Sequence, residues 1–395
     1  MFVRTVRATP LVEPDPTPGT DDVRVLHLID SLALGGTEQS LIAVAPELLS
    51  RGVDLHVATL SDRSDLAPRL RDLGVPVTVG LGSGRRSAMR ASIAHVRSVR
   101  PDVIHTSLFE ATLAGALAGR RTSVPVLTSL VSTEFGRQHY QAPGLRRHRV
   151  AGAHVAAVGA ARAVAGFHAV SCHVADTMSR RLAVPRRRIT VIPRGRDPKA
   201  LGRRSIERRR DTRAALGYGA ETPLVLAVAR HDHAKGLDLA IQAVGLLRET
   251  IPDIQLAVAG PDGPATADLH DLSDRLAAPV RFLGRRDDVA DLMSAADALC
   301  FPSRREGMPG AVLEAMALEL PVVAAGLPVV GEMLGADHPV SDHEPEHIAH
   351  LLGETLAGRH PDVGRLRDRF DERFTVSAVA DATVAWYRSH SGVPA

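Results

Sequence analysis

The sequence predicts an α/β protein in which two doubly wound domains face each other across a cleft. A chain of 395 residues exceeds one ordinary hydrophobic core, and two domains of usual size account for it better. From about residue 23 onward, short apolar runs alternate with amphipathic segments, the pattern of parallel strands joined by crossover helices. Two such series follow one another, so we expect one parallel sheet in each half.

The strands of both series are apolar without alternation, which predicts that both of their faces are buried. Helical periodicity fills the stretches between them, as in Thr37–Leu49 and Ser87–Val99. We expect strands at Val23–Ile29, Val53–Leu60, Val103–His105, Val126–Ser129, Ala169–Ser171 and Ile189–Ile192 in the first series, and at Leu224–Ala229, Ile254–Ala259, Val280–Leu283, Ala298–Phe301 and Val322–Ala325 in the second.

Four segments follow from this pattern. Residues 1–20 are rich in proline and lack the apolar core of a signal peptide, so we expect a disordered leader. Residues 21–198 form the N-terminal domain and 199–374 the C-terminal domain, with the arginine-rich stretch Arg196–Arg213 as the hinge. Residues 375–395 should form a C-terminal helix that packs back on the N-terminal domain.

Composition narrows the class of protein. Aromatic residues make up 3% of the chain, which leaves little material for stacking on bases, so no nucleic-acid partner is expected. Cys172 and Cys300 are far apart and are expected to be buried free thiols of a reduced compartment. No apolar run is long enough to span a membrane, which favours a cytoplasmic protein. The excess of basic side chains lies in residues 1–200. We interpret these side chains as part of a solvated surface; the alternative is that they make peripheral contact with the inner face of a membrane.

Two loops after predicted strands carry features of a phosphate site. Gly35 and Gly36 follow the first strand and precede a helix, whose free N–H groups suit a diphosphate; a plain glycine-rich turn is the alternative. Arg230 and Lys235 follow the first strand of the second series and can reach one phosphate group. Lysine occurs only at positions 199 and 235, so its use at 235 is informative, although a solvated helix start remains the alternative.

The loop at residues 302–317 is the most specific. It follows the strand Ala298–Phe301, and Pro309 suits the first turn of the next helix. Glu306 then precedes the helix and Glu314 lies within it, so both carboxylates can face one ligand. Carboxylates accept hydrogen bonds from the vicinal hydroxyls of a ribose or hexose. The alternative is a carboxylate that caps the helix or pairs with arginine.

These residues resemble the retaining glycosyltransferases of family 4, which have the GT-B fold. The similarity covers nearly all of the chain after residue 22 and is strongest in the Glu-x7-Glu motif, Glu306 to Glu314. It implies that Glu306 contacts the transferred sugar and that Glu314 binds the ribose. It further implies catalytic or donor-binding roles for Arg230 and Lys235 at the diphosphate. The remaining donor-binding positions that it implies are Gly35, Gly36, Gly284, Arg285, Met308, Pro309, Gly310 and Ala311.

The resemblance implies a retaining, metal-independent hexosyltransferase without a cofactor. Its donor would be a nucleoside-diphosphate sugar, with UDP or GDP as the nucleotide. The acceptor stays open among a polysaccharide, a glycolipid and a small molecule.

Two positions depart from the family pattern. The histidine that many relatives carry after the strand at 126–129 is replaced by leucine or serine, and Arg194 stands where asparagine is usual before Gly195. They motivate a first alternative, a nucleotide-sugar-binding protein of the same fold with weak or no activity. A second alternative is another enzyme on two such domains, an epimerase or a glycan phosphorylase, against which the Glu306–Glu314 pair argues.

Overall fold

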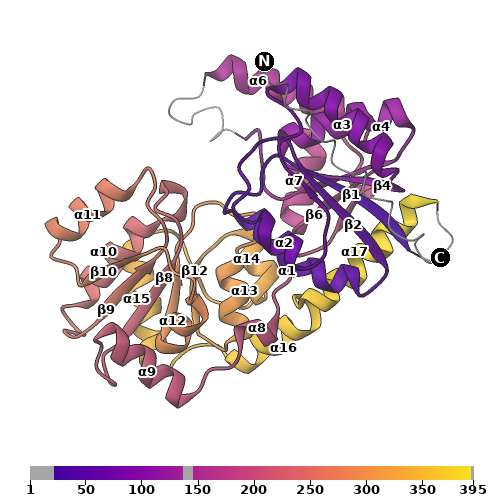
Figure 1. Cartoon of the computed structure of the whole chain (residues 1–395). Coiled ribbons are helices and arrows are strands. Elements are labelled where there is room, and N and C mark those ends of the chain that lie inside the picture. Colours follow the sequence, from indigo (N-terminus) through magenta and orange to yellow (C-terminus); the bar gives the residue numbers. More distant parts are fainter. Residues whose placement is uncertain (1–21, 137–145, 393–395) are drawn as a thin grey trace, which may run out of the picture.

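The computed structural model describes residues 22–136 and 146–392. The leader expected at 1–20 therefore lies outside the described residues. The chain forms two α/β domains, each with one fully parallel sheet covered by helices on both faces (Figure 1). The predicted fold class is confirmed.

The N-terminal sheet has seven strands in the order β3-β2-β1-β4-β5-β6-β7. In Figure 1, α3 and α4 stand on one face of this sheet and α1 and α17 on the other. The elements of this part of the chain are β1 (Val23–Ile29), α1 (Gly36–Leu49), β2 (Val53–Thr59), α2 (Ala67–Asp72), β3 (Val77–Thr78), α3 (Arg85–Val99), β4 (Val103–Ser107), α4 (Phe109–Thr122), β5 (Val126–Leu130), α6 (Arg147–Ala161), β6 (Gly166–Ala169), α7 (Cys172–Arg181), the 3-10 turn η1 (Arg186–Arg188) and β7 (Ile189–Val191).

The C-terminal sheet has six strands in the order β10-β9-β8-β11-β12-β13. The elements of this part are α8 (Pro198–Leu201), α9 (Ile206–Leu216), β8 (Leu224–Val228), the 3-10 turn η2 (His233–Lys235), α10 (Leu237–Leu247), β9 (Gln255–Ala259), α11 (Thr266–Arg275), β10 (Val280–Gly284), α12 (Val289–Ala295), β11 (Ala298–Phe301), α13 (Gly310–Ala317), β12 (Val322–Ala325), α14 (Pro328–Leu334), β13 (Val340–Ser341), α15 (Pro345–Leu356), α16 (Val363–Arg373) and α17 (Val376–Ser391).

The strands are apolar without alternation because both of their faces are buried, as expected. Leu26 and Leu28 of β1 enter one hydrophobic cluster, whereas Val23, Val25 and Ile29 enter another on the opposite face of the sheet. Burial on both faces requires an unbroken apolar run, because side chains alternate between the faces.

Two local expectations were wrong. The strand expected at 169–171 ends at Ala169 as β6, and Ser171 instead caps α7 by accepting a hydrogen bond from the backbone N–H of Val174 at 3.2 Å. Cys300 is buried as expected, but Cys172, the first residue of that helix, is exposed; both are free thiols.

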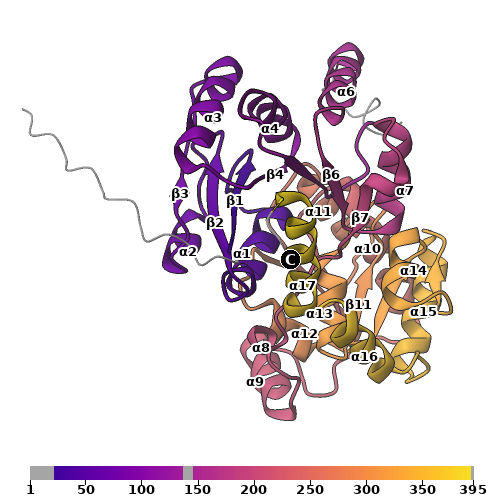
Figure 2. The same cartoon turned by 90° about the vertical axis from the view of Figure 1, so that its right-hand side faces the viewer.

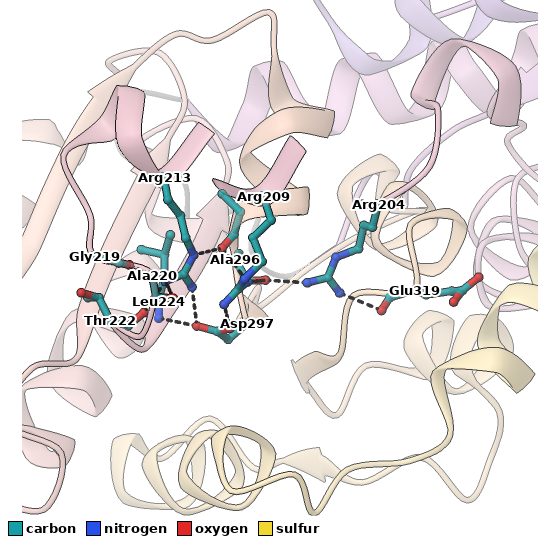
Figure 3. A network of polar contacts seen from close by, with 11 residues as sticks. Arg204, Arg209, Arg213, Gly219, Ala220, Thr222, Leu224, Ala296, Asp297 and Glu319 are labelled. Carbon is teal, nitrogen blue, oxygen red and sulfur yellow. Dashed lines mark hydrogen bonds and ion pairs between the residues drawn. The ribbon is translucent and has the colours of Figure 1, made fainter. Parts of the chain in front are cut away.

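The arginine-rich segment between the domains is more ordered than its sequence indicated. It contains α8 and α9, and Arg213 of α9 is 2% exposed. Arg213 and Arg209 both bond the carboxylate of Asp297, at 2.8 and 2.5 Å, and that carboxylate also accepts from the backbone N–H of Leu224 at 2.8 Å (Figure 3). These arginines therefore anchor α9 to the amino ends of β8 and β11.

The chain crosses between the domains twice, and the two crossings are bonded to each other. The backbone N–H of Arg196 donates to the carbonyl of Phe374 at 2.9 Å, and the N–H of Val376 donates back to the carbonyl of Arg196 at 3.0 Å. From there α17 runs back along α1 (Figure 2) and buries Val379, Val384 and Trp386 in a core cluster of the N-terminal domain.

Candidate active site

Two loops that follow β8 and β11 bring a lysine and a glutamate together. The Nζ of Lys235 donates to Oε1 of Glu306 at 2.7 Å, and the Oγ of Ser303 donates to the same oxygen at 3.0 Å. The backbone N–H of Arg304 donates to the carbonyl of Ala234 at 2.8 Å, which fastens one loop to the other. The side chain of Glu306 is 11% exposed and that of Lys235 is 30% exposed. The pair is thus held in place yet open to a ligand.

The start of α13 lies beside this pair. Pro309 is the N-cap, and the helix begins at Gly310, so Glu306 precedes the helix and Glu314 lies within it. Oε1 of Glu314 accepts from Nε of Arg196 at 2.7 Å. A Cβ added to Gly310 would lie 1.9 Å from Nη2 of Arg196, so only glycine lets this guanidinium lie over the helix start.

The glycine loop of the N-terminal domain approaches the same region. A Cβ added to Gly36 would lie 3.1 Å from Nη1 of Arg194, and one added to Gly35 would lie 2.3 Å from Oε2 of Glu38. Arg194 in turn donates from Nη1 to the carbonyl of Met308 at 3.1 Å. Arg194 therefore links the glycine loop to the segment before α13.

Arg194 is the most perturbed cation of the site. Burial, reinforced by Arg196, lowers its pKa to about 10, while Glu306 and Glu38 act in the opposite direction. Burial likewise raises the pKa of Glu38, and Arg194 partly offsets this rise. Buried charges tend to lie near opposite charge, so this arginine and the two carboxylates form one electrostatic unit across the cleft.

The two domains touch on either side of the site. A Cβ added to Gly307 would lie 2.1 Å from the carbonyl of Val131, so the loop before α13 packs directly on the end of β5. The carboxylate of Glu332 in α14 accepts from the backbone N–H groups of Cys172 and His173, both at 2.7 Å. A carboxylate at the N-terminus of α7 is favourable, so this contact stabilises the observed approach of the domains.

Not every expected donor-site residue joins this cluster. Arg230 follows β8 but is exposed, and its Nη2 bonds Oδ2 of Asp232 at 3.0 Å. Gly284 ends β10, an edge strand, with a φ of 64°, and Arg285 reaches Asp287 at 3.4 Å. No hydrogen bond or ion pair of the described residues joins these three to Lys235, Glu306 or Glu314.

The end of β5, where leucine or serine replaces the family histidine, is largely buried. Leu130 ends β5 and is 7% exposed. Of the histidines in the strands of the N-terminal sheet, His27, His105 and His168 form a buried network beneath α17.

The sequence analysis assigned no donor-site role to three residues of the cluster: Arg194, Arg196 and Ser303. The available signal was their place in the chain, because Arg194 and Arg196 flank Gly195 where the chain leaves the first domain, and Ser303 directly follows a strand end. In residues 22–136 and 146–392, no three His, Cys, Asp or Glu side chains converge as a metal site, and no helix is long and apolar enough to cross a membrane.

Family models match both halves of the chain. The family model described as "Glycosyltransferase Family 4" matches residues 34–200, and "Glycosyl transferases group 1" matches 222–357, so the two together cover both domains. A D-inositol 3-phosphate glycosyltransferase of Kineococcus radiotolerans is 26% identical, over 97% of this chain and 94% of its own. A 2-deoxystreptamine glucosyltransferase of Streptomyces kanamyceticus is 28% identical, over 83% and 87%.

Solved structures show the same architecture. Anabaena HepE, solved in complex with UDP and glucose, superposes with a TM-score of 0.80 at 21% identity over 93% of this chain and 100% of its own. WaaG, a glycosyltransferase involved in lipopolysaccharide biosynthesis, superposes with a TM-score of 0.72 at 17% identity over 94% and 100%. The chain belongs to glycosyltransferase family 4 and has its two-domain GT-B fold.

Proposed function

We propose that this glycosyltransferase moves a hexose from a nucleoside-diphosphate sugar to an acceptor hydroxyl and retains the anomeric configuration. The observation that carries the proposal is the Lys235–Glu306 pair beside the start of α13. It offers a cation for a leaving phosphate and a carboxylate for sugar hydroxyls within one hydrogen-bonded unit.

The donor would lie along this cluster. Lys235 and the exposed Arg230 supply positive charge to the diphosphate, and the free N–H groups of Gly310 and Ala311 add helix N-terminal donors. We propose that Glu314 binds the ribose through its Oε2, which makes no hydrogen bond within the described residues, while Oε1 stays on Arg196. Gly35 and Gly36 would cover the diphosphate, and Gly284 and Arg285 would flank the base.

The reaction breaks the bond between the anomeric carbon and the donor's phosphate oxygen, and the electron pair leaves with the nucleoside diphosphate. The acceptor oxygen forms its bond to that carbon on the same face, and its proton passes to the departing phosphate. The negative charge that develops on the phosphate is stabilised by side-chain cations, so we propose that no metal ion takes part. Contact of the domains around Gly307 would exclude water.

The similar proteins support particular substrates. HepE is described with UDP and glucose, which favours a uridine nucleotide. The two relatives are named for cyclitol acceptors, D-inositol 3-phosphate and 2-deoxystreptamine, so a small cyclitol is the acceptor to try first.

The test compares Glu306→Gln with Glu319→Gln, an exposed glutamate just beyond α13. Transfer and slow hydrolysis of UDP-glucose and GDP-mannose are followed by release of the nucleotide. We expect Glu306→Gln to lower turnover by about a hundredfold or more, because a charge-assisted contact to the sugar is lost, and Glu319→Gln to leave it unchanged. Equal turnover of wild type and Glu306→Gln would contradict the assignment, and a product of inverted configuration by NMR would contradict retention.

A second candidate function is donor binding without transfer. It is favoured by leucine or serine at the histidine position and by Arg194 in place of asparagine. Wild-type protein that binds a nucleotide sugar but neither transfers nor hydrolyses it would support this candidate.

A further inference from the structure

A large cavity lies at the amino end of the C-terminal sheet, whereas the Lys235–Glu306 pair lies at the carboxyl end. The cavity has a volume of about 630 Å³, and its walls are the segment between α8 and α9, the ends of α12 and α13, and α16. Among the described residues, four arginines and two carboxylates line it: Arg203, Arg204, Arg209, Arg367, Glu319 and Asp371. Its lining is therefore more basic than acidic.

Two of these four arginines already have a carboxylate partner. Nε of Arg367 lies 2.7 Å from Oδ2 of Asp371, and Nη2 of Arg209 lies 2.5 Å from Oδ1 of Asp297, which stands outside the lining. The other two guanidinium groups are then left with the exposed carboxylate of Glu319.

Arg204 is one of these two, and it is held in place by backbone carbonyls alone. Its Nη1 donates to the carbonyl of Glu319 at 3.1 Å and its Nη2 to that of Ala296 at 2.9 Å, so the guanidinium bridges the ends of α13 and α12 (Figure 3). Burial lowers its pKa and Arg209 adds to this effect, whereas Asp297 and Glu319 act in the opposite direction. It makes no ion pair with a carboxylate of residues 22–136 and 146–392, so its partly buried charge can still be matched by an anion.

Arg203 is the other, and its guanidinium is free. The residue is exposed, and its side chain makes no hydrogen bond or ion pair in the described part of the chain. A phosphate group accepts hydrogen bonds from several N–H groups at once and suits adjacent guanidinium groups. The volume of the cavity leaves room for the small molecule that would carry this phosphate.

The cavity is also connected to the donor site. Helix α13 begins at Gly310, beside the Lys235–Glu306 pair, and its last residue, Ala317, lines the cavity. The segments that cross between the domains lead to its walls, because α8 follows the crossing at Arg196 and α16 precedes the crossing at Phe374. A ligand held in the cavity would therefore fix α13 and both crossings relative to one another.

We propose that this cavity is a regulatory site for a phosphate group, held by Arg203 and Arg204, and that its occupancy strengthens donor binding through α13 and the two crossings. The inference goes beyond the proposed function, because the cavity lies outside the cleft in which donor and acceptor would meet. Linkage then requires that the donor strengthen phosphate binding by the same factor.

The test is calorimetric titration of inorganic phosphate into wild type, Arg203→Gln and Arg210→Gln. The side chain of Arg203 makes no bond that the fold needs, and Arg210 is the matched control, an exposed arginine of α9 that pairs with Asp211 outside the cavity. We expect saturable binding that weakens about tenfold in Arg203→Gln, the loss of one charge-assisted contact, and that stays within about twofold in Arg210→Gln. Lys235→Met should bind phosphate in this cavity as wild type does.

Three results would overturn the site: no saturable phosphate binding, equal affinity of wild type and Arg203→Gln, or loss of binding in Lys235→Met, which would place the phosphate at the donor site. Glycerol 3-phosphate, with glycerol as its control, then separates the two sources of phosphate. Tighter binding of glycerol 3-phosphate than of inorganic phosphate would identify a phosphate ester as the ligand, and the reverse order would identify free phosphate.

Titration of UDP with and without saturating phosphate measures the linkage. We expect UDP to bind about fivefold more tightly to phosphate-loaded wild type, and Arg203→Gln to need more phosphate for the same gain. Unchanged UDP affinity would overturn the regulatory role. Absence of UDP binding to wild type would contradict the donor assignment instead, and the phosphate titrations, which contain no nucleotide, would still decide whether the cavity is a phosphate site.

Discussion

Acid should destabilise the N-terminal domain through three histidines buried beneath α17. His27 and His105 come from the neighbouring strands β1 and β4, with their rings 4.3 Å apart, and His168 comes from β6, beyond β5. His105 bonds the hydroxyl of Tyr387 at 2.7 Å and Oγ of Ser129 at 2.6 Å. Burial lowers the pKa of all three, to about 3 for His27 and about 4 for His168, and the neighbouring rings add to the effect for His27 and His105.

The sign and the size of this change in stability follow from the linkage between proton binding and folding. The folded pKa values lie below the unfolded value of 6.5, so the unfolded chain binds more protons between about pH 6.5 and pH 3. The stabilisation is complete above pH 6.5 and is lost as the pH falls through this window. At pH 5 the loss is about 2 kcal/mol each for His27 and His168. Burial raises the pKa of Asp30 to about 6, which offsets about 1 kcal/mol in the opposite direction. His27, His168 and Asp30 together give a loss of about 3 kcal/mol between pH 8 and pH 5, and His105, whose pKa is also lowered, adds to it.

The assay is urea unfolding at pH 8 and pH 5, followed by the fluorescence of Trp386. This is the only tryptophan of the chain, and its ring lies 5.4 Å from that of His105 and 5.6 Å from that of His168. In His27→Gln the amide can keep the bond to Oγ of Ser107, now at 2.9 Å, without a titrating group. We expect the pH dependence to shrink by about 2 kcal/mol, and the exposed His360→Gln to leave it unchanged. The same pH dependence in His27→Gln as in wild type would refute the reasoning.

Three further predictions concern other contacts. Gly310→Ala should displace Arg196 and so remove one charge-assisted contact, which should raise the KM for the donor about tenfold in steady-state kinetics. Gly331→Ala is the control: an added Cβ there meets nothing within 4 Å, so its KM should not change. Equal KM values for Gly310→Ala and wild type would contradict the crowding of Arg196 against Gly310. Asp297→Asn should cost about 3 kcal/mol in urea unfolding, because it leaves the buried guanidinium group of Arg213 without its carboxylate; a cost below about 1 kcal/mol would contradict this. Glu332→Gln should loosen the contact of α14 with α7 and increase the radius of gyration in small-angle X-ray scattering; an unchanged radius would show that this contact does not hold the domains together.

The sequence predicted the architecture because the architecture depends on local patterns. Strands buried on both faces need unbroken apolar runs, and Val23–Ile29 is both such a run and β1. Errors occurred where short polar segments decide a boundary. The helix cap at Ser171, for example, was mistaken for the end of a strand.

The candidate site was predictable where residues lie within one loop, and less so where contacts join distant segments. Glu306, Pro309 and Gly310 share a loop and helix start, so their proximity follows from spacing. The bonds of Arg196 to Glu314 and of Arg194 to Met308 span more than a hundred positions of the chain, and no local pattern indicates them. In Arg196–Arg213 the arginines and the lack of an apolar pattern indicated a hinge, because a sequence does not reveal that Asp297 will neutralise a buried guanidinium group.

The most direct test of the central claim is calorimetric titration of UDP, GDP, ADP and dTDP, and of their glucose or mannose conjugates, into wild type and Lys235→Met. The account predicts that the uridine or the guanosine nucleotides bind in preference to the others, and that Lys235→Met weakens this binding about tenfold or more, since one charge-assisted contact to phosphate is worth about 1.5–3 kcal/mol. Absence of binding by every nucleotide, or equal affinity of wild type and Lys235→Met, would contradict the assignment of the Lys235–Glu306 cluster as the donor site.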